Sequence, residues 1–159
     1  MIFVTVGSQL PFIRLINIVD HWAKLNPKHE VFAQIGDTEL TPKYIQYVFR
    51  LSPKEYREKT QKAKVIVGHV GMGTIITGID LNKPMVLMPR LSQFGEHRND
   101  HQLSTVEHFA DVSSLQVVTN QEEFDCAMGR VLTDSTNRIE AEFKVSEALL
   151  TAISDFVRS

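Results

Sequence analysis

Short apolar runs alternate along the chain with longer segments in which apolar positions recur at helical spacing. The apolar runs are continuous and rich in β-branched residues, which is typical of strands covered on both faces. We expect strands at residues 2–6, 30–34, 44–51, 64–67, 84–88 and 115–118. Strands that alternate with helices form βαβ units, so the pattern predicts a parallel sheet.

Helix-start signals agree with this order. Helices are expected from residue 11, from residue 53, at about 74–81, up to about 109, from residue 121 and at about 137–157. Pro11 opens the first, Ser52 and Glu55 have the spacing of a capping box, and Asn120 is placed as an N-cap. The last of these helices carries an apolar stripe that either closes the core or forms an interaction surface.

We interpret residues 1–159 as a single α/β domain, a Rossmann-like parallel sheet with helices on both faces. In folds of this kind ligands bind at the carboxyl ends of the strands. Three polar segments follow predicted strand ends, at residues 7–9, 69–74 and 90–102. We therefore expect these segments to meet at one ligand site.

The composition excludes several classes of protein. The 159 residues carry a formal net charge of -2, whereas a nucleic-acid-binding domain shows a basic footprint, so we expect no nucleic-acid partner. The single cysteine, Cys126, cannot form an internal disulfide, which suits a reducing compartment. No apolar run approaches the roughly 18 residues that span a bilayer, and the first residues do not resemble a signal peptide. These features favour an intracellular protein, and if it works at a membrane we expect another protein to hold it there.

The segment GHVGMGT, residues 68–74, lies between a predicted strand and a predicted helix. It is not a Walker A loop, because no Lys follows the final glycine, and its G-x-x-G-x-G spacing is not the dinucleotide-binding fingerprint. Glycines still let the backbone approach an anion closely, and the N–H groups at a helix N-terminus favour phosphate. The segment is either a phosphate site or a tight turn that requires small residues.

Three side chains near this turn extend the hypothesis. Thr77 and Asp80 follow Gly73 by four and seven residues, on the same helical face, so either could reach the ribose of a bound nucleotide. Asp80 could equally be a solvated surface residue. His69 ends the preceding strand, where its imidazole could donate to a phosphate or brace the turn.

The segment GEHRNDHQ, residues 95–102, combines side-chain donors and acceptors of the kind that sugar hydroxyls require. His97 and His101 have the i, i+4 spacing of zinc ligands, but no convincing third ligand accompanies them, so we expect no metal. The sequence GSQ at residues 7–9 is either a further wall of the ligand site or a plain turn.

Together the stretches MIFVTVGSQLPFIRLI, GHVGMGTIITGIDLNKPMVLMPR and GEHRNDHQ resemble the C-terminal, donor-binding half of GT-B glycosyltransferases of family 28. The likeness is greatest to the small PssE-like subunits of bacterial polysaccharide glycosyltransferases. The chain is also similar to the catalytic subunit of the eukaryotic enzyme that adds the second GlcNAc to the dolichol-linked glycan.

The resemblance implies that the chain binds a UDP-sugar. The diphosphate would contact residues 71–74, the sugar would contact residues 100–102, and the uracil would lie near the strand end at residues 49–51. Asp80 matches an acidic position of the PssE-like pattern, whereas related chains place a ribose-binding acid where Thr77 stands, so both stay candidates. The expected donor-binding residues are Gly7, Ser8, Leu51, Gly71, Met72, Gly73, Thr74, Thr77, Asp80, Asp100, His101 and Gln102. The catalytic candidates are His69, beside the leaving diphosphate, and Glu96.

Such enzymes invert the anomeric centre without a bound metal or other cofactor, and their general base usually lies on the acceptor-side domain. The resemblance therefore implies a membrane-anchored, PssD-like partner subunit that brings a lipid-linked acceptor during capsule or exopolysaccharide synthesis. One alternative is a non-catalytic nucleotide-sugar-binding module that regulates a partner. Another is a flavodoxin-like or NAD-binding protein, which the glycine spacing disfavours.

Overall fold

The computed structural model describes residues 1–109, 112, 114–134 and 154. Within these residues the strands form one parallel sheet of order β3-β2-β1-β4-β5-β6. The strands are β1 (Ile2–Thr5), β2 (Val31–Gln34), β3 (Gln46–Val48), β4 (Val65–His69), β5 (Met85–Met88) and β6 (Leu115–Val117). The helices are α1 (Ile13–Leu25), α2 (Pro53–Lys62), α3 (Met72–Asp80), α4 (His101–His108) and α5 (Gln121–Asp134), with a 3-10 turn η1 (Ser92–Phe94).

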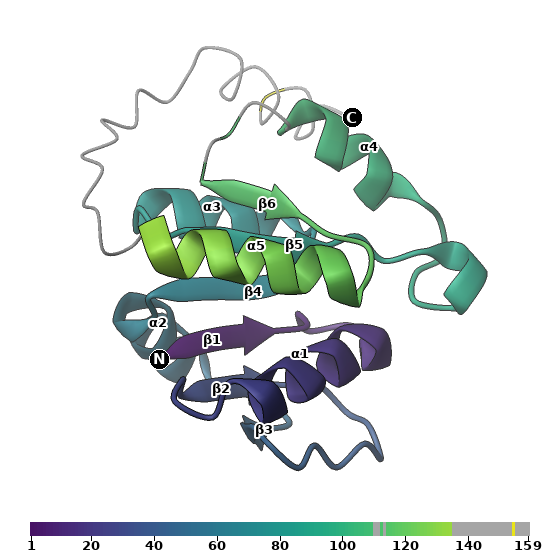
Figure 1. The fold of residues 1–159 in the computed structure, drawn as a ribbon. Helices are drawn as coiled ribbons and strands as arrows, with labels where there is room; N and C mark the ends of the chain where they lie inside the picture. The colour runs from purple at the N-terminus through teal and green to yellow at the C-terminus, as the bar shows by residue number, and fades with distance from the viewer. Residues whose placement is uncertain (110–111, 113, 135–153, 155–159) are drawn as a thin grey trace.

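Helices cover both faces of the sheet. In Figure 1, α1 and α5 lie on the near face, and α2 and α3 lie on the far face. Side chains alternate across a strand, so Ile2 and Val4 of β1 pack with the α1 and α5 side, while Phe3 packs with Ile75 of α3. The central strands are therefore mostly apolar, as the sequence pattern predicts, and their polar side chains, Thr5 of β1 and His69 of β4, stand at the carboxyl ends.

Strand order reverses in the middle of the sheet. β1 pairs with β2 on one side and with β4 on the other, and the chain then continues outward through β5 and β6. The loops that leave β1 and β4 run to helices on opposite faces (Figure 1), and in folds of this kind the ligand crevice lies at the carboxyl ends of these two strands. This crevice lies between Val6–Gly7 and His69–Gly71.

Local signals place the helices that border the crevice. Ser52 accepts a hydrogen bond from the N–H of Glu55, and the Glu55 carboxylate accepts one from the N–H of Ser52, so the predicted capping box forms. Asn120 likewise accepts from the N–H of Glu123 at the start of α5. Helix α1 buries one stripe of apolar residues, which includes Leu15 and Trp22.

The predicted fold class is confirmed, and the differences concern element boundaries. β3 has three residues instead of eight, since it is an edge strand with a single neighbour. Helix α3 begins at Met72, two residues earlier than predicted, with Gly71 as its N-cap. The turn η1 was not predicted. The expected helix at about 137–157 lies outside the described residues, apart from residue 154. Whether its apolar stripe closes the core or forms an interaction surface therefore stays open.

In the part of the chain that the structure describes, no helix is both long and apolar enough to cross a membrane.

Candidate nucleotide-sugar site

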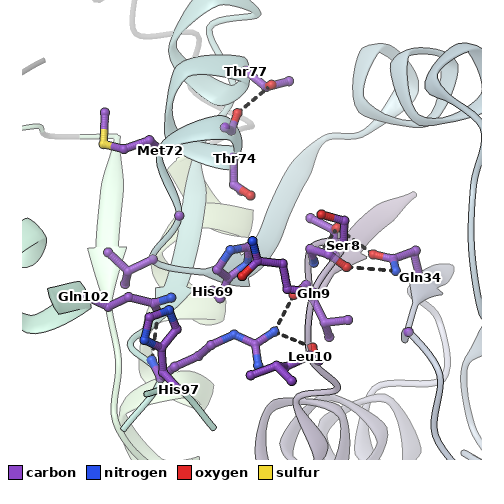
Figure 2. Close-up of a pocket in the computed structure, with 18 of the residues that line it drawn as sticks. Ser8, Gln9, Leu10, Gln34, His69, Met72, Thr74, Thr77, His97 and Gln102 are labelled. Carbon is purple, nitrogen blue, oxygen red and sulfur yellow. Dashed lines mark hydrogen bonds between the residues drawn. The ribbon is translucent and has the colours of Figure 1, made fainter. Parts of the chain in front are cut away.

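A cavity of about 1620 Å³ lies over the carboxyl ends of β1 and β4. Its walls are the β1–α1 loop, the first turns of α2 and α3, and the segment from Arg90 into α4. Figure 2 shows His69 near its middle, with Gln9 on one side, Gln102 and His97 on the other, and Thr74 and Thr77 on the adjacent helix. Three polar segments that are far apart in sequence therefore meet, as predicted.

The His69 imidazole fits between two glycine turns. A Cβ on Gly7 would lie 2.7 Å from Cε1 of His69, and a Cβ on Gly71 would collide with Nε2. Gly7 also has a φ of 81°, a left-handed conformation that other residues rarely adopt. Both glycines are thus required by the histidine side chain, whatever ligand the cavity holds.

His69 is electrically neutral at physiological pH. Burial, together with the nearby charges of Arg90 and His97, lowers its pKa to about 4, although the backbone of Thr5 acts in the opposite direction. Nδ1 is buried without a hydrogen-bond partner among the described residues. The neutral ring carries one N–H and one lone pair but no positive charge, and its buried Nδ1 is not the atom that a ligand would reach.

The first turn of α3 is open to the cavity. Gly71 provides no side-chain cap, and the N–H groups of Met72, Gly73 and Thr74 have no acceptor among the described residues. A Cβ on Gly73 would meet nothing within 4 Å. Packing within the protein thus gives no reason for a glycine at this position, whereas a ligand seated on the helix N-terminus does.

Only one of the two ribose candidates faces the cavity. Thr77 lines it and donates its hydroxyl hydrogen to the carbonyl of Gly73 at 2.7 Å, which leaves its oxygen lone pairs for a ligand. Asp80 is exposed in the last turn of α3 and is not among the lining residues.

In the segment at residues 95–102, too, only some of the candidate side chains line the cavity. His97, His101 and Gln102 line the cavity. Asp100 does not: its carboxylate accepts a hydrogen bond from the N–H of Ser92 at 2.9 Å, and this bond lowers its pKa.

Glu96 is buried and lies outside the lining residues. Its carboxylate accepts two hydrogen bonds from Arg14, at 2.8 and 2.9 Å, and a third from the N–H of Leu91 at 2.9 Å. This is the environment of a structural side chain, which binds the loop at residues 91–96 to α1. A catalytic role for Glu96 stays a prediction that these contacts do not favour.

Several lining residues were not predicted from the sequence. Gln34 accepts from Thr5 at 2.9 Å and donates to the carbonyls of Gly7 and Phe49, so it joins the ends of three strands. Tyr56 of α2 packs edge-on against Phe3 and lines the cavity; burial raises its pKa, and the hydroxyls of Thr74 and Thr77 act in the opposite direction. Neither residue belongs to a motif, so no sequence signal singled it out.

The charges of the lining favour an anion. The described lining residues include Arg50, Arg57 and Arg90 but a single acid, Asp37, which is paired with Arg50. No group of three or more His, Cys, Asp or Glu among the described residues is arranged to hold a metal ion. The expectation that no metal or other cofactor is required stays a prediction.

The model of the glycosyltransferase family 28 C-terminal domain matches residues 1–154. The chain belongs to this family. No curated protein matches it. The match confirms the family that the sequence resembles. It does not establish the PssE-like designation.

Solved structures share the fold of this family 28 domain. The calicheamicin glycosyltransferase CalG4 superposes with a TM-score of 0.64 at 14% identity, covering 99% of this chain and 41% of its own. MurG of Acinetobacter baumannii gives 0.59 at 15% identity, over 84% and 41%. ALG13 gives 0.56 at 17% identity, over 86% and 85%. The chain thus spans about two fifths of the first two proteins but most of the third.

We predict that the pKa of His69 makes the protein less stable in acid. The pKa is about 4 in the folded chain and about 6.5 when the ring is exposed, so the unfolded state binds more protons between these values. The free energy of unfolding should fall as the pH drops from 6.5 towards 4. In His69→Asn this part of the pH dependence should disappear. Ring NMR signals that titrate near 6.5 would contradict the prediction.

Proposed function

We propose that this chain is the donor-binding, catalytic subunit of an inverting glycosyltransferase that uses a UDP-sugar. The observation that carries the proposal is the first turn of α3, which faces a cavity lined by arginines with an unobstructed Gly73 and with three N–H groups that have no acceptor among the described residues. Such a terminus binds phosphate through its N–H groups and its dipole. The family 28 match supports a glycosyltransferase as the setting.

The cavity has room for each part of the donor. The diphosphate would lie on residues 71–74, and the ribose on Thr77, since Asp80 is not among the lining residues. The uracil would lie towards Leu51, beyond the end of β3, and the sugar towards His101 and Gln102. The rhamnosyltransferase SpnG, which shares the fold with a TM-score of 0.50 at 16% identity, was solved in complex with thymidine diphosphate. That complex supports a nucleoside diphosphate as the ligand class.

The reaction follows from where charge develops. An acceptor hydroxyl attacks the anomeric carbon, the bond from that carbon to the phosphate oxygen breaks, and the electron pair stays on the leaving UDP. The N–H groups of α3 and the nearby arginines stabilise this charge, which is electrostatic catalysis. Neutral His69 can donate one hydrogen bond to the diphosphate. The proton of the acceptor hydroxyl must go to a general base.

No unpaired carboxylate among the described lining residues can act as the general base. Asp37 is the single acid among the described lining residues, and it is paired with Arg50. We therefore assign the base and the acceptor site to a membrane-anchored, PssD-like partner. This partner would place the complex at the cytoplasmic face of the membrane, with a lipid-linked acceptor for capsular or exopolysaccharide synthesis. The same observation also fits a non-catalytic module that binds nucleotide-sugars.

The first test of the site is Gly73→Asp. The added carboxylate would lie beside the diphosphate, where two like charges about 4 Å apart cost about 4 kcal/mol at a surface dielectric. We expect UDP affinity, measured by calorimetry, to fall at least about 100-fold. Gly129→Asp is the matched control, because Gly129 is also helical and unobstructed but lies on α5, away from the cavity. If the two variants bind UDP with equal affinity, the diphosphate does not bind at the N-terminus of α3.

A second pair of variants assigns the ribose contact. Thr77→Val keeps the side-chain shape but removes the hydroxyl, so UDP affinity should fall about fivefold, as expected for one hydrogen bond of about 1 kcal/mol. Asp80→Asn should bind UDP like the wild type. The reverse result would move the ribose to Asp80.

Reconstitution separates the enzyme from the regulatory module. We expect the purified chain to bind UDP-sugar but to transfer sugar to a lipid-linked acceptor only with the PssD-like partner, and the Gly73→Asp complex to be inactive. Full transfer by the chain alone would refute the divided active site. Donor binding without transfer in any combination would favour the non-catalytic module.

A further inference from the structure

Arg90 follows β5 and is almost entirely buried, with 3% of its surface exposed. Both terminal nitrogens of its guanidinium donate to backbone carbonyls. One donates to Pro11 and Glu96 at 2.9 and 3.2 Å, and the other donates to Leu10 at 2.7 Å and to Val6. The terminal N–H groups of the side chain therefore donate to four main-chain oxygens.

This guanidinium has no hydrogen-bonded carboxylate among the described residues. The nearest candidate, Glu96, gives its carboxylate to Arg14 and offers Arg90 only a carbonyl. The ring of Phe12 covers the guanidinium at 4.7 Å from its centroid. An arginine suits this place because its planar fork can reach several acceptors in fixed directions, whereas a lysine ammonium offers one point of attachment.

The acceptors lie at both ends of the β1–α1 loop. Val6 precedes Gly7, Ser8 and Gln9, which line the cavity, and Leu10 and Pro11 follow them. Gln34 anchors the same loop from the other side through the carbonyl of Gly7, and Figure 2 shows Ser8 next to Gln34. The loop is thus fixed at three places although it has no secondary structure.

Arg90 also reaches the opposite wall of the cavity. Its backbone N–H donates to the side-chain oxygen of Gln102 at 2.8 Å, at the start of α4. This bond uses the amide oxygen of Gln102, so the amide nitrogen is the end left to face the cavity. One residue therefore sets the position of Gln102 on one wall and of Ser8 and Gln9 on the other.

We propose that Arg90 is a positioning residue for the donor: it holds the β1–α1 loop and Gln102 in the arrangement that binds the nucleotide-sugar. The inference rests on the proposed function, and it adds a residue that acts through others. With its terminal N–H groups directed at carbonyls, Arg90 has none of them left for the phosphates. Its effect on affinity comes from preorganisation, because a loop fixed before binding loses less entropy on binding.

The test compares Arg90→Lys with Arg14→Lys. Arg14 is a matched control because it also makes forked hydrogen bonds, to Glu96 and to the carbonyls of Pro89 and Thr119, and it also packs near Phe12. It does not contact the β1–α1 loop carbonyls and does not line the cavity. Both variants should lower the melting temperature.

Calorimetry with UDP should separate the two variants. We expect Arg90→Lys to weaken UDP binding at least about tenfold, equivalent to losing one or two hydrogen bonds, and Arg14→Lys to change it less than about threefold. Equal losses in both variants would mean that only overall stability matters, and wild-type affinity in Arg90→Lys would overturn the inference. If the wild type does not bind UDP, the proposed function fails instead.

NMR decides the role of Arg90 even if its variant does not fold. In the wild type, the terminal N–H signals of Arg90 should be resolved and should hardly move when UDP is added, while the amides of residues 7–9 shift. Large UDP-induced shifts of the Arg90 signals would show that it contacts the ligand, which contradicts a positioning role. In folded Arg90→Lys without ligand, the amides of residues 7–10 should shift more than in Arg14→Lys. Unchanged loop amides would also overturn the inference.

Discussion

The fit of the His69 ring between Gly7 and Gly71 is the contact on which the site depends. It occurs where the strand order reverses, so the turns after β1 and β4 diverge and leave a gap that neither main chain can fill. The imidazole fills that gap and is buried there as a neutral ring. A methyl group on either glycine would displace the ring, and the two turns would lose the spacing that exposes the N-terminus of α3.

Main-chain oxygens surround this contact and bind buried polar side chains. Arg90, Gln34 and Thr5 take part in hydrogen bonds that join β1, β2, β3 and the start of α4. In a low-dielectric environment such bonds are strong, and any polar group left out of them is costly. Nδ1 of His69 is a buried group of this costly kind, since it has no hydrogen-bond partner among the described residues. Because the hydrogen bonds of Arg90, Gln34 and Thr5 are made within the protein, the walls of the cavity are fixed before a ligand arrives. The donors that face the cavity need not be rearranged.

The sequence predicts those parts of the molecule that local signals determine. Continuous apolar runs identify the strands, the Ser52–Glu55 pair starts α2, and glycine spacing marks the first turn of α3. The roles of Gln34 and of Arg90, which begins a segment expected at the site, escaped prediction. Arg90 binds carbonyls some 80 positions away, and carbonyls have no sequence signature.

Helical periodicity explains a different kind of ambiguity. It places Thr77 and Asp80 on one face of α3, but it does not say how far along the helix the cavity extends. The cavity includes the first turns of α3 and stops before Asp80. Similarly, polar density at residues 95–102 identifies a segment, while the fold divides it: His101 and Gln102 face the cavity, and Glu96 and Asp100 hold the loop.

The distribution of charge explains how a domain of this kind can favour one step of a transfer reaction. Its described lining is rich in cations and N–H donors and contains no unpaired carboxylate, so it stabilises negative charge and offers no carboxylate to accept a proton. Stabilising a leaving diphosphate requires such a surface, because a carboxylate beside the phosphates would repel them. A general base must nevertheless approach the anomeric carbon from the side opposite the leaving group if the reaction inverts that centre. Those two requirements conflict on a single small surface, and placing the base on a separate acceptor-side body satisfies both.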